Sequence, residues 1–149
     1  MTPAEFFHHV VKKNYEAHCS QPNDFHHLWN AVVSMNTVAE YLALERVDYA
    51  EISREDLAQR ANKIRDKTLH LGDLKYCAET LKHVRKIVDH RDKSFSLQAS
   101  STGIAPEGET TWLIGTFDLS ILLRNAMAEL ETFPELQLHS GPTSPAAQP

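Results

Sequence analysis

The sequence predicts a mainly α-helical protein, a single-domain bundle of about five helices with a β-hairpin inserted before the last helix. Apolar residues recur every three or four positions over most of the 149-residue chain, which is the pattern of amphipathic helices. Before the last such stretch, the sequence alternates between apolar and polar residues and then contains glycine and proline, as in a hairpin with a loop. The length and the 42% hydrophobic content are typical of one soluble domain.

The first predicted helix starts after Thr2 and runs to about His18. Thr2 and Glu5 form a capping box around Pro3, which suits the first helical position. The stretch CSQPND breaks the helix, and Asn23 or Asp24 can cap a second helix that runs to about residue 44. Its apolar residues step by three or four and predict a core-facing seam: Leu28, Val32, Met35, Ala39 and Leu42.

Two further helices are predicted after a short connection at 45–52. Ser53 and Asp56 open the third, whose apolar face is expected to comprise Leu57, Ala61, Ile64, Thr68 and Leu71. Gly72 is predicted to end it and Asp73 to cap a fourth helix, which runs to about Asp89. The apolar residues of that fourth helix repeat the same spacing: Leu74, Cys77, Leu81, Val84 and Val88.

The hairpin is predicted at about 94–116, where SFSLQAS and TTWLIGT are β-prone and flank a loop that is rich in glycine and proline. A last helix begins near Asp118 and stops at Pro134. The bundle domain is thus expected to span 1–134. The tail at 135–149 has few apolar residues and is expected to be disordered.

Charge and composition narrow the classes of function. A net charge of −5 argues against binding nucleic acid over the whole surface, although a local basic patch can still do so. Cys19 and Cys77 share no CxxC spacing and are expected to be buried thiols in a reducing compartment. We find no signal peptide and no run of about 18 apolar residues, so a cytoplasmic protein without a membrane partner is expected.

The nine histidines raise the question of a metal site. Glu79 and His83 have the spacing of four that brings two ligands to one side of a helix. A site built from three helices stays open as an alternative and would make the protein a metal-binding bundle enzyme; its ligands would be His8 or His9, His26 or His27, and His83. The favoured interpretation needs neither metal nor cofactor.

A polar stripe runs beside the apolar seam of the second helix, with Glu40 near its C-terminal end. Its members step by three or four residues and are His27, Asn30, Ser34, Thr37 and Tyr41. Such a stripe is either solvent-facing or, because it lacks Lys and Glu, the wall of a pocket or a polar dimer face. His27 and Asn30 are therefore candidate binding residues.

The end of the fourth helix is basic within an acidic protein. Its cations and histidines outnumber Asp89 and Asp92 and are Lys82, His83, Arg85, Lys86, His90, Arg91 and Lys93. Basic residues at a helix C-terminus are favoured by the helix dipole alone. The same residues would also suit contacts with phosphate groups.

This segment, LKHVRKIVDHRD, resembles the end of the conserved helix of HEPN domains, whose motif is Arg, a polar residue, a few more residues and then His. The stretch DFHHLWNAVVSMNTVAEYLAL is similar to their second helix. The spacing occurs twice, at Arg65 with His70 and at Arg85 with His90, and the later pair is preferred because a polar break follows it. Lys86 stands where the family usually has Asn.

The resemblance implies a small helical bundle, often dimeric, that acts as a metal-independent ribonuclease or as a non-catalytic component of defence or toxin–antitoxin systems. It implies that His90 is the general acid or base and that Arg85 holds the scissile phosphate. Lys82, His83, Lys86 and Arg91 would then bind RNA. The remaining alternative is an interaction module without chemistry, whose basic helix end docks on an acidic protein.

Overall fold

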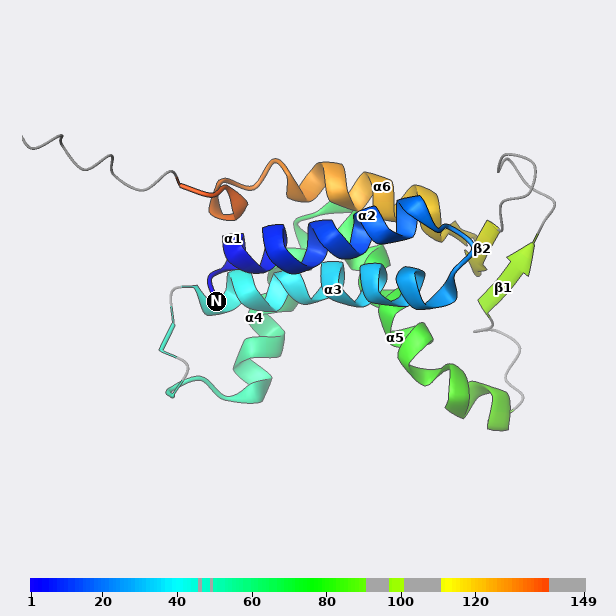
Figure 1. Cartoon of the computed structure of the whole chain (residues 1–149). Coiled ribbons are helices and arrows are strands. Elements are labelled where there is room, and N and C mark those ends of the chain that lie inside the picture. The colour runs from blue at the N-terminus through cyan, green and yellow to red at the C-terminus, as the bar shows by residue number, and fades with distance from the viewer. Residues whose placement is uncertain (46, 49, 91–96, 101–110, 140–149) are drawn as a thin grey trace, which may run out of the picture.

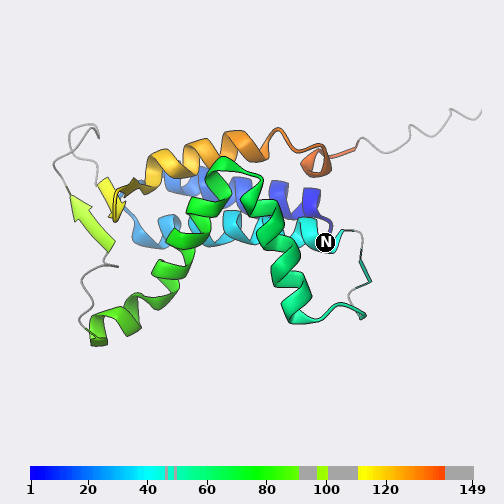
Figure 2. The same cartoon turned by 180° about the vertical axis from the view of Figure 1, so that it is seen from behind.

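The computed structural model describes residues 1–45, 47–48, 50–90, 97–100 and 111–139, and it describes their side chains except at 83–90 and 97–100. The chain forms the predicted mainly helical bundle, with the hairpin before the last long helix (Figure 1). Seen from behind, α4 and α5 form a V that crosses the other helices (Figure 2).

The N-terminal rod is continuous and consists of α1 (Pro3–Phe6), the π-helical η1 (Phe7–Val11) and α2 (Lys12–Ser20). The predicted capping box is present. The Thr2 side chain accepts a hydrogen bond from the backbone N–H of Glu5 at 3.1 Å, and the Glu5 carboxylate accepts one from the Thr2 N–H at 2.8 Å.

The central helix is α3 (Phe25–Leu44), which contacts α2, α4, α5 and α6. Asp24 caps it by accepting a hydrogen bond from the His26 N–H at 2.8 Å. The predicted seam is confirmed for its first four residues, which are fully buried, and Leu42 is half-buried. Because α3 touches so many other helices, its seam organises most of the core: with it are buried Phe6, Phe7, Val11, Leu71, Leu74, Cys77, Ile114, Leu119, Leu123 and Leu130.

Helices α4 (Arg54–Asp66) and α5 (Leu69–His90) meet at a turn four residues earlier than predicted. The prediction that Gly72 ends the third helix is wrong, because Thr68 makes the turn. Its hydroxyl donates to the carbonyl oxygens of Ile64 at 3.2 Å and of Arg65 at 2.8 Å. Gly72 instead lies in the first turn of α5, where glycine costs only about 1 kcal/mol relative to alanine.

The predicted hairpin comprises β1 (Leu97–Ser100) and β2 (Thr111–Ile114), paired antiparallel with Leu97 opposite Ile114. A third strand, β3 (Phe117–Asp118), follows β2 through a tight turn at Gly115, whose φ of 57° favours glycine. Trp112 of β2 fixes the sheet to the bundle, because its indole N–H donates to the Pro22 carbonyl oxygen at 2.8 Å.

The last long helix is α6 (Leu119–Leu130), which begins next to Asp118 as predicted and is capped by that residue. It ends at Leu130, so the prediction that it runs to Pro134 is wrong. A short turn, η3 (Pro134–Leu136), follows it, and Leu136 is fully buried. The bundle therefore extends two residues past the expected boundary at 134. The later part of the predicted tail, 140–149, lies outside the described residues.

Candidate functional site

The predicted catalytic pair, Arg85 and His90, belongs to the last part of α5, which continues as one helix to residue 90. The side chains of both lie outside the described residues, as do those of His83 and Lys86; Arg91 lies wholly outside. On the described part of α5, Leu81 is buried and Lys82 is exposed. Toward its C-terminal end the helix leads away from α3 and α6 (Figures 1 and 2).

The second pair with the same spacing, Arg65 and His70, makes contacts with neighbouring helices of the bundle. Arg65 is 5% exposed and donates from Nη2 to the Asn36 carbonyl oxygen of α3 at 3.0 Å. His70 lies near α6 instead: its backbone N–H donates to the Glu129 carboxylate at 3.1 Å, and its Nε2 is 3.9 Å from the same group. The two side chains serve different neighbouring helices, so they do not form one site.

Arg65 belongs to a polar network that joins α3, α4 and α5. Its guanidinium also donates to Asn62 Oδ1 at 3.2 Å and lies 3.4 Å from Glu40 Oε1, while Lys75 donates to the same Asn62 oxygen at 3.0 Å. The Nε of Arg65 and the Oδ1 of Asn36 are buried and have no hydrogen-bond partner among the described residues. The network therefore fixes how three helices pack and leaves two polar atoms unsatisfied.

Most side chains of the polar stripe of α3 make contacts within the bundle. The Ser34 hydroxyl donates to the Asn30 carbonyl oxygen at 2.6 Å, and the Thr37 hydroxyl to that of Val33 at 2.8 Å, so both satisfy themselves within the helix. Tyr41 stacks on Phe6 of α1 with ring centroids 4.0 Å apart. The candidate binding residue Asn30 is half-buried.

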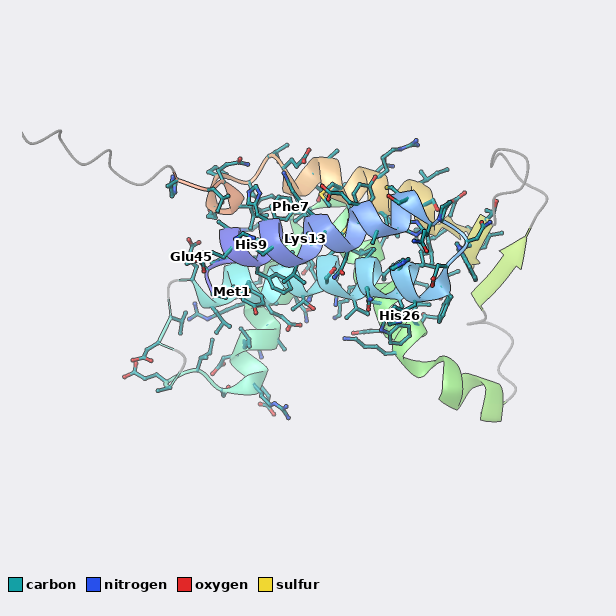
Figure 3. All side chains as sticks on the ribbon, viewed as in Figure 1. Met1, Phe7, His9, Lys13, His26 and Glu45 are labelled. Carbon is teal, nitrogen blue, oxygen red and sulfur yellow. The ribbon has the colours of Figure 1, made fainter. Side chains whose placement is uncertain are left out.

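Among the candidate metal ligands, His8 and His27 do not converge in the described part of the bundle, and the side chain of His83 lies outside the described residues. His8 contacts the Leu136 carbonyl oxygen at 3.0 Å, whereas His27 lies 3.9 Å from Asp24 at the start of α3. His9 and His26 accordingly lie at opposite ends of the bundle (Figure 3). Within the described part of the chain, no group of three or more His, Cys, Asp or Glu side chains is arranged to hold a metal ion.

Among the histidines whose side chains the structure describes, His18 alone is buried, with 3% of its surface exposed. Its Nε2 lies 3.4 Å from the Ser120 hydroxyl of α6, and its Nδ1 has no partner among the described residues. Burial lowers the pKa of this imidazole, and the charge of His27 lowers it further. His18 is therefore neutral near pH 7 and links α2 to α6.

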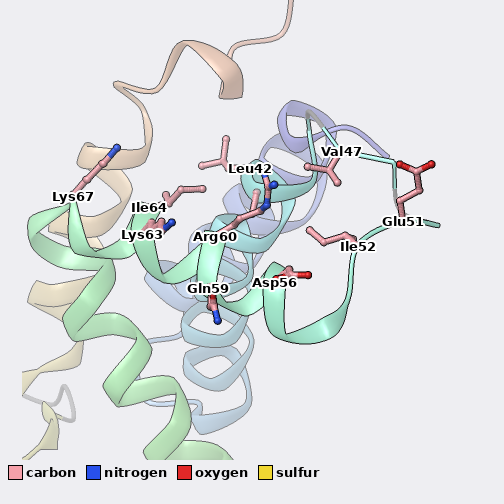
Figure 4. A pocket seen from close by; sticks show the side chains of 11 residues that line it. Leu42, Val47, Glu51, Ile52, Asp56, Gln59, Arg60, Lys63, Ile64 and Lys67 are labelled. Carbon is pink, nitrogen blue, oxygen red and sulfur yellow. The ribbon is translucent and has the colours of Figure 1, made fainter.

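A feature that we did not predict from the sequence is an open cleft of about 900 Å³ on the outer face of α4 (Figure 4). The connection between α3 and α4 forms one side, and α4 forms the other. Its lining residues are Leu42, Ala43, Val47, Glu51, Ile52, Asp56, Gln59, Arg60, Lys63, Ile64 and Lys67. The available signal was the spacing of Arg60, Lys63 and Lys67, which puts three cations on one face of a helix.

No family model, curated protein or solved structure matches this chain. Of the helices in the described part of the chain, none has the length and apolar character that crossing a membrane requires.

Proposed function

We propose that the protein binds RNA through the C-terminal part of α5, as the HEPN domains that it resembles do with the corresponding helix. The observation that carries the proposal is the continuity of α5 as one helix to residue 90, beyond the part that packs in the bundle. Of this basic segment the structure describes the side chain of Lys82, which is exposed.

Helical spacing supports a basic face on this segment. Positions 83, 86 and 90 follow one another at intervals of three and four and are occupied by His83, Lys86 and His90. Lys82, four residues before Lys86, adds an exposed cation beside that face, and Arg91 continues the charge in the sequence. Cations clustered on one face bind phosphate groups by releasing counterions, even in a chain whose net charge is negative.

The contacts of Arg65 and His70 within the bundle support the choice of the end of α5 as the RNA-binding segment. Both residues have protein partners in the bundle, so the earlier of the two HEPN-like spacings has no group left for a substrate. The later spacing, Arg85 with His90, is the one on which a catalytic proposal rests.

Metal-independent cleavage is the second candidate function, favoured by the resemblance. In it His90 moves a proton at the ribose 2′-hydroxyl or at the leaving oxygen, and Arg85 neutralises the phosphate. Five residues of α-helix separate two positions by about 7.5 Å along the axis and about 140° around it. One helix therefore does not place the pair on one face, and in this proposal a second protomer completes the cleft.

The binding proposal is tested with a fluorescent single-stranded RNA of mixed sequence, in EDTA, by fluorescence anisotropy. The double substitution Lys82→Glu with Lys86→Glu is expected to raise Kd at least about tenfold, since two phosphate contacts become repulsive. The matched control reverses two exposed cations elsewhere, Lys13→Glu with Arg54→Glu, and should leave Kd nearly unchanged.

An equal loss of affinity in both double variants would contradict a site on α5. Binding of an acidic peptide in place of RNA would replace the proposal with the docking of an acidic protein. Cleavage is scored in the same samples: His90→Ala should abolish it, while His9→Ala, which changes an exposed histidine of the N-terminal rod, should not.

A further inference from the structure

The cleft on the outer face of α4 plays no part in the proposed RNA contact, and its floor is apolar. Leu42 and Ala43 come from α3, Val47 and Ile52 from the connection, and Ile64 from α4. All five are buried or half-buried. A volume of about 900 Å³ lies within the range of small-molecule sites, and six of the eleven lining residues around the apolar floor are polar or charged.

The α4 side of the cleft carries three exposed cations, Arg60, Lys63 and Lys67. None of them forms an ion pair with another residue in the described part of the chain. In Figure 4 Arg60 and Lys63 extend from α4 toward the space beside Leu42. The helix dipole favours Lys67 at the C-terminal end, but the effect fades within one turn and does not account for Arg60.

Two carboxylates also line the cleft, Glu51 on the connection and Asp56 in the first turn of α4. The Asp56 carboxylate is fixed, because it accepts a hydrogen bond from the Ser53 hydroxyl at 2.7 Å. Three cations against two carboxylates leave a small positive excess, which lies with Arg60, Lys63 and Lys67 along α4. A polyanion such as RNA would meet repulsion across the cleft, whereas a single anionic group can sit beside α4.

We propose that this cleft binds a small amphipathic carboxylate, with the anionic head between Arg60 and Lys63 and the apolar chain over the floor. Each half of the proposal rests on its own observation: the unpaired cations recognise the head, and Val47, Ile52 and Ile64 cover the chain. A carboxylate accepts hydrogen bonds from a guanidinium in a planar, bidentate geometry, which Arg60 can provide.

The test is isothermal titration calorimetry of the whole chain with sodium decanoate below its micelle concentration. Sodium acetate, which lacks the chain, and decan-1-ol, which lacks the charge, are titrated beside it. Decanoate is expected to bind at least about tenfold more tightly than either, because only decanoate satisfies both parts of the cleft.

Substitution then locates the site. The double variant Arg60→Gln with Lys63→Gln should weaken decanoate binding at least about tenfold. The matched control, Lys13→Gln with Arg54→Gln, removes the same charge, and one of its changes lies on α4 outside the cleft. The control should bind decanoate as the unmodified chain does, and circular dichroism of both variants should match that chain.

Three results would overturn the proposal: no heat of binding with decanoate, equal affinity for decan-1-ol, or equal weakening in the two double variants. Displacement of decanoate only by an acidic peptide that binds far more tightly would also overturn it, since the cleft would then be a protein interface. The variant Lys82→Glu with Lys86→Glu should retain decanoate binding, so the RNA proposal and this one can fail separately.

Discussion

Helix α4 carries cations on two faces, and the two faces differ in what those cations contact. On the inner face Arg65 is buried and donates to a backbone carbonyl of α3 and to Asn62. On the outer face Arg60, Lys63 and Lys67 are exposed around a cleft and have no ion-pair partner in the part of the chain that the structure describes. The same residue types thus stabilise the fold on one side and remain available to a ligand on the other.

The contrast between packed and exposed groups can be tested most strongly at the two cysteines. Cys77 is fully buried in α5, and burial, aided by the charge of Asp73, raises the pKa of its thiol to about 12. Cys19 is exposed near the end of α2, so the expectation that both thiols are buried is wrong for this one. Cys77 should react with Ellman's reagent at least about a thousandfold more slowly than Cys19, because its thiol must first be uncovered by opening of the fold.

Single substitutions show which cysteine gives which rate of reaction with Ellman's reagent. Cys19→Ser should remove the fast phase and Cys77→Ser the slow one, and denaturant should merge both phases. Equal rates in the native protein would mean that the core around α5 is not packed as described.

The inner and outer faces of α4 should differ sharply in their effect on stability. Arg65→Ala removes the side-chain donor to the Asn36 carbonyl oxygen and one of the two donors to Asn62 Oδ1, and we expect it to lower the free energy of unfolding by about 2–4 kcal/mol. Arg65→Met keeps most of the volume and should cost less. Urea unfolding measures both.

The matched change on the outer face is Arg60→Ala, which should alter the free energy of unfolding by no more than about 0.5 kcal/mol. If Arg60→Ala destabilised the protein as much as Arg65→Ala does, the outer cations would be structural and the contrast would be lost.

A smaller effect is expected from the pH dependence of stability. Because burial lowers the pKa of His18 in the folded state, the unfolded chain takes up a proton first as the pH falls. The stability that the neutral imidazole contributes is present above its unfolded pKa of about 6.5 and is lost as the pH falls below it. The uptake of one proton can change the free energy of unfolding by at most about 1.4 kcal/mol per pH unit.

Urea unfolding at pH 7 and at pH 5 checks this. His18→Gln can keep the contact with Ser120 without titrating, so its stability should fall less between the two pH values than that of the unmodified chain. His9→Gln changes an exposed histidine and should behave as the unmodified chain. The same fall in all three proteins would show that other groups govern the acid response.

Helix periodicity was enough to predict the core of α3, and the capping residues predicted the caps at Thr2 and Ser53 and, with Asn23 as the alternative, at Asp24, because these depend on residues close in sequence. It missed the turn between α4 and α5, where the Thr68 hydroxyl competes with the helix for two carbonyl groups. In the sequence, a threonine that makes local hydrogen bonds of this kind cannot be told from an ordinary helical threonine.

The candidate sites were harder to predict, because they depend on contacts between distant segments. Arginine is rarely buried, so nothing in the sequence separated Arg65 from Arg60. The cleft exists because the connection after α3 lies against the outer face of α4, and a connection of that length has many other paths. The polar stripe left a solvent-facing surface, a pocket wall and a polar dimer face open, and the sequence did not show that Ser34 and Thr37 bond to their own helix.

The central proposal, that the end of α5 contacts RNA, is tested most directly by the salt dependence of RNA binding. The logarithm of the binding constant is measured against the logarithm of the NaCl concentration for the unmodified chain and for Lys82→Ala with Lys86→Ala. Two lost phosphate contacts should reduce the magnitude of the slope by about 1.4. Lys13→Ala with Arg54→Ala should leave it unchanged, and equal slopes in all three proteins would contradict an RNA site on α5.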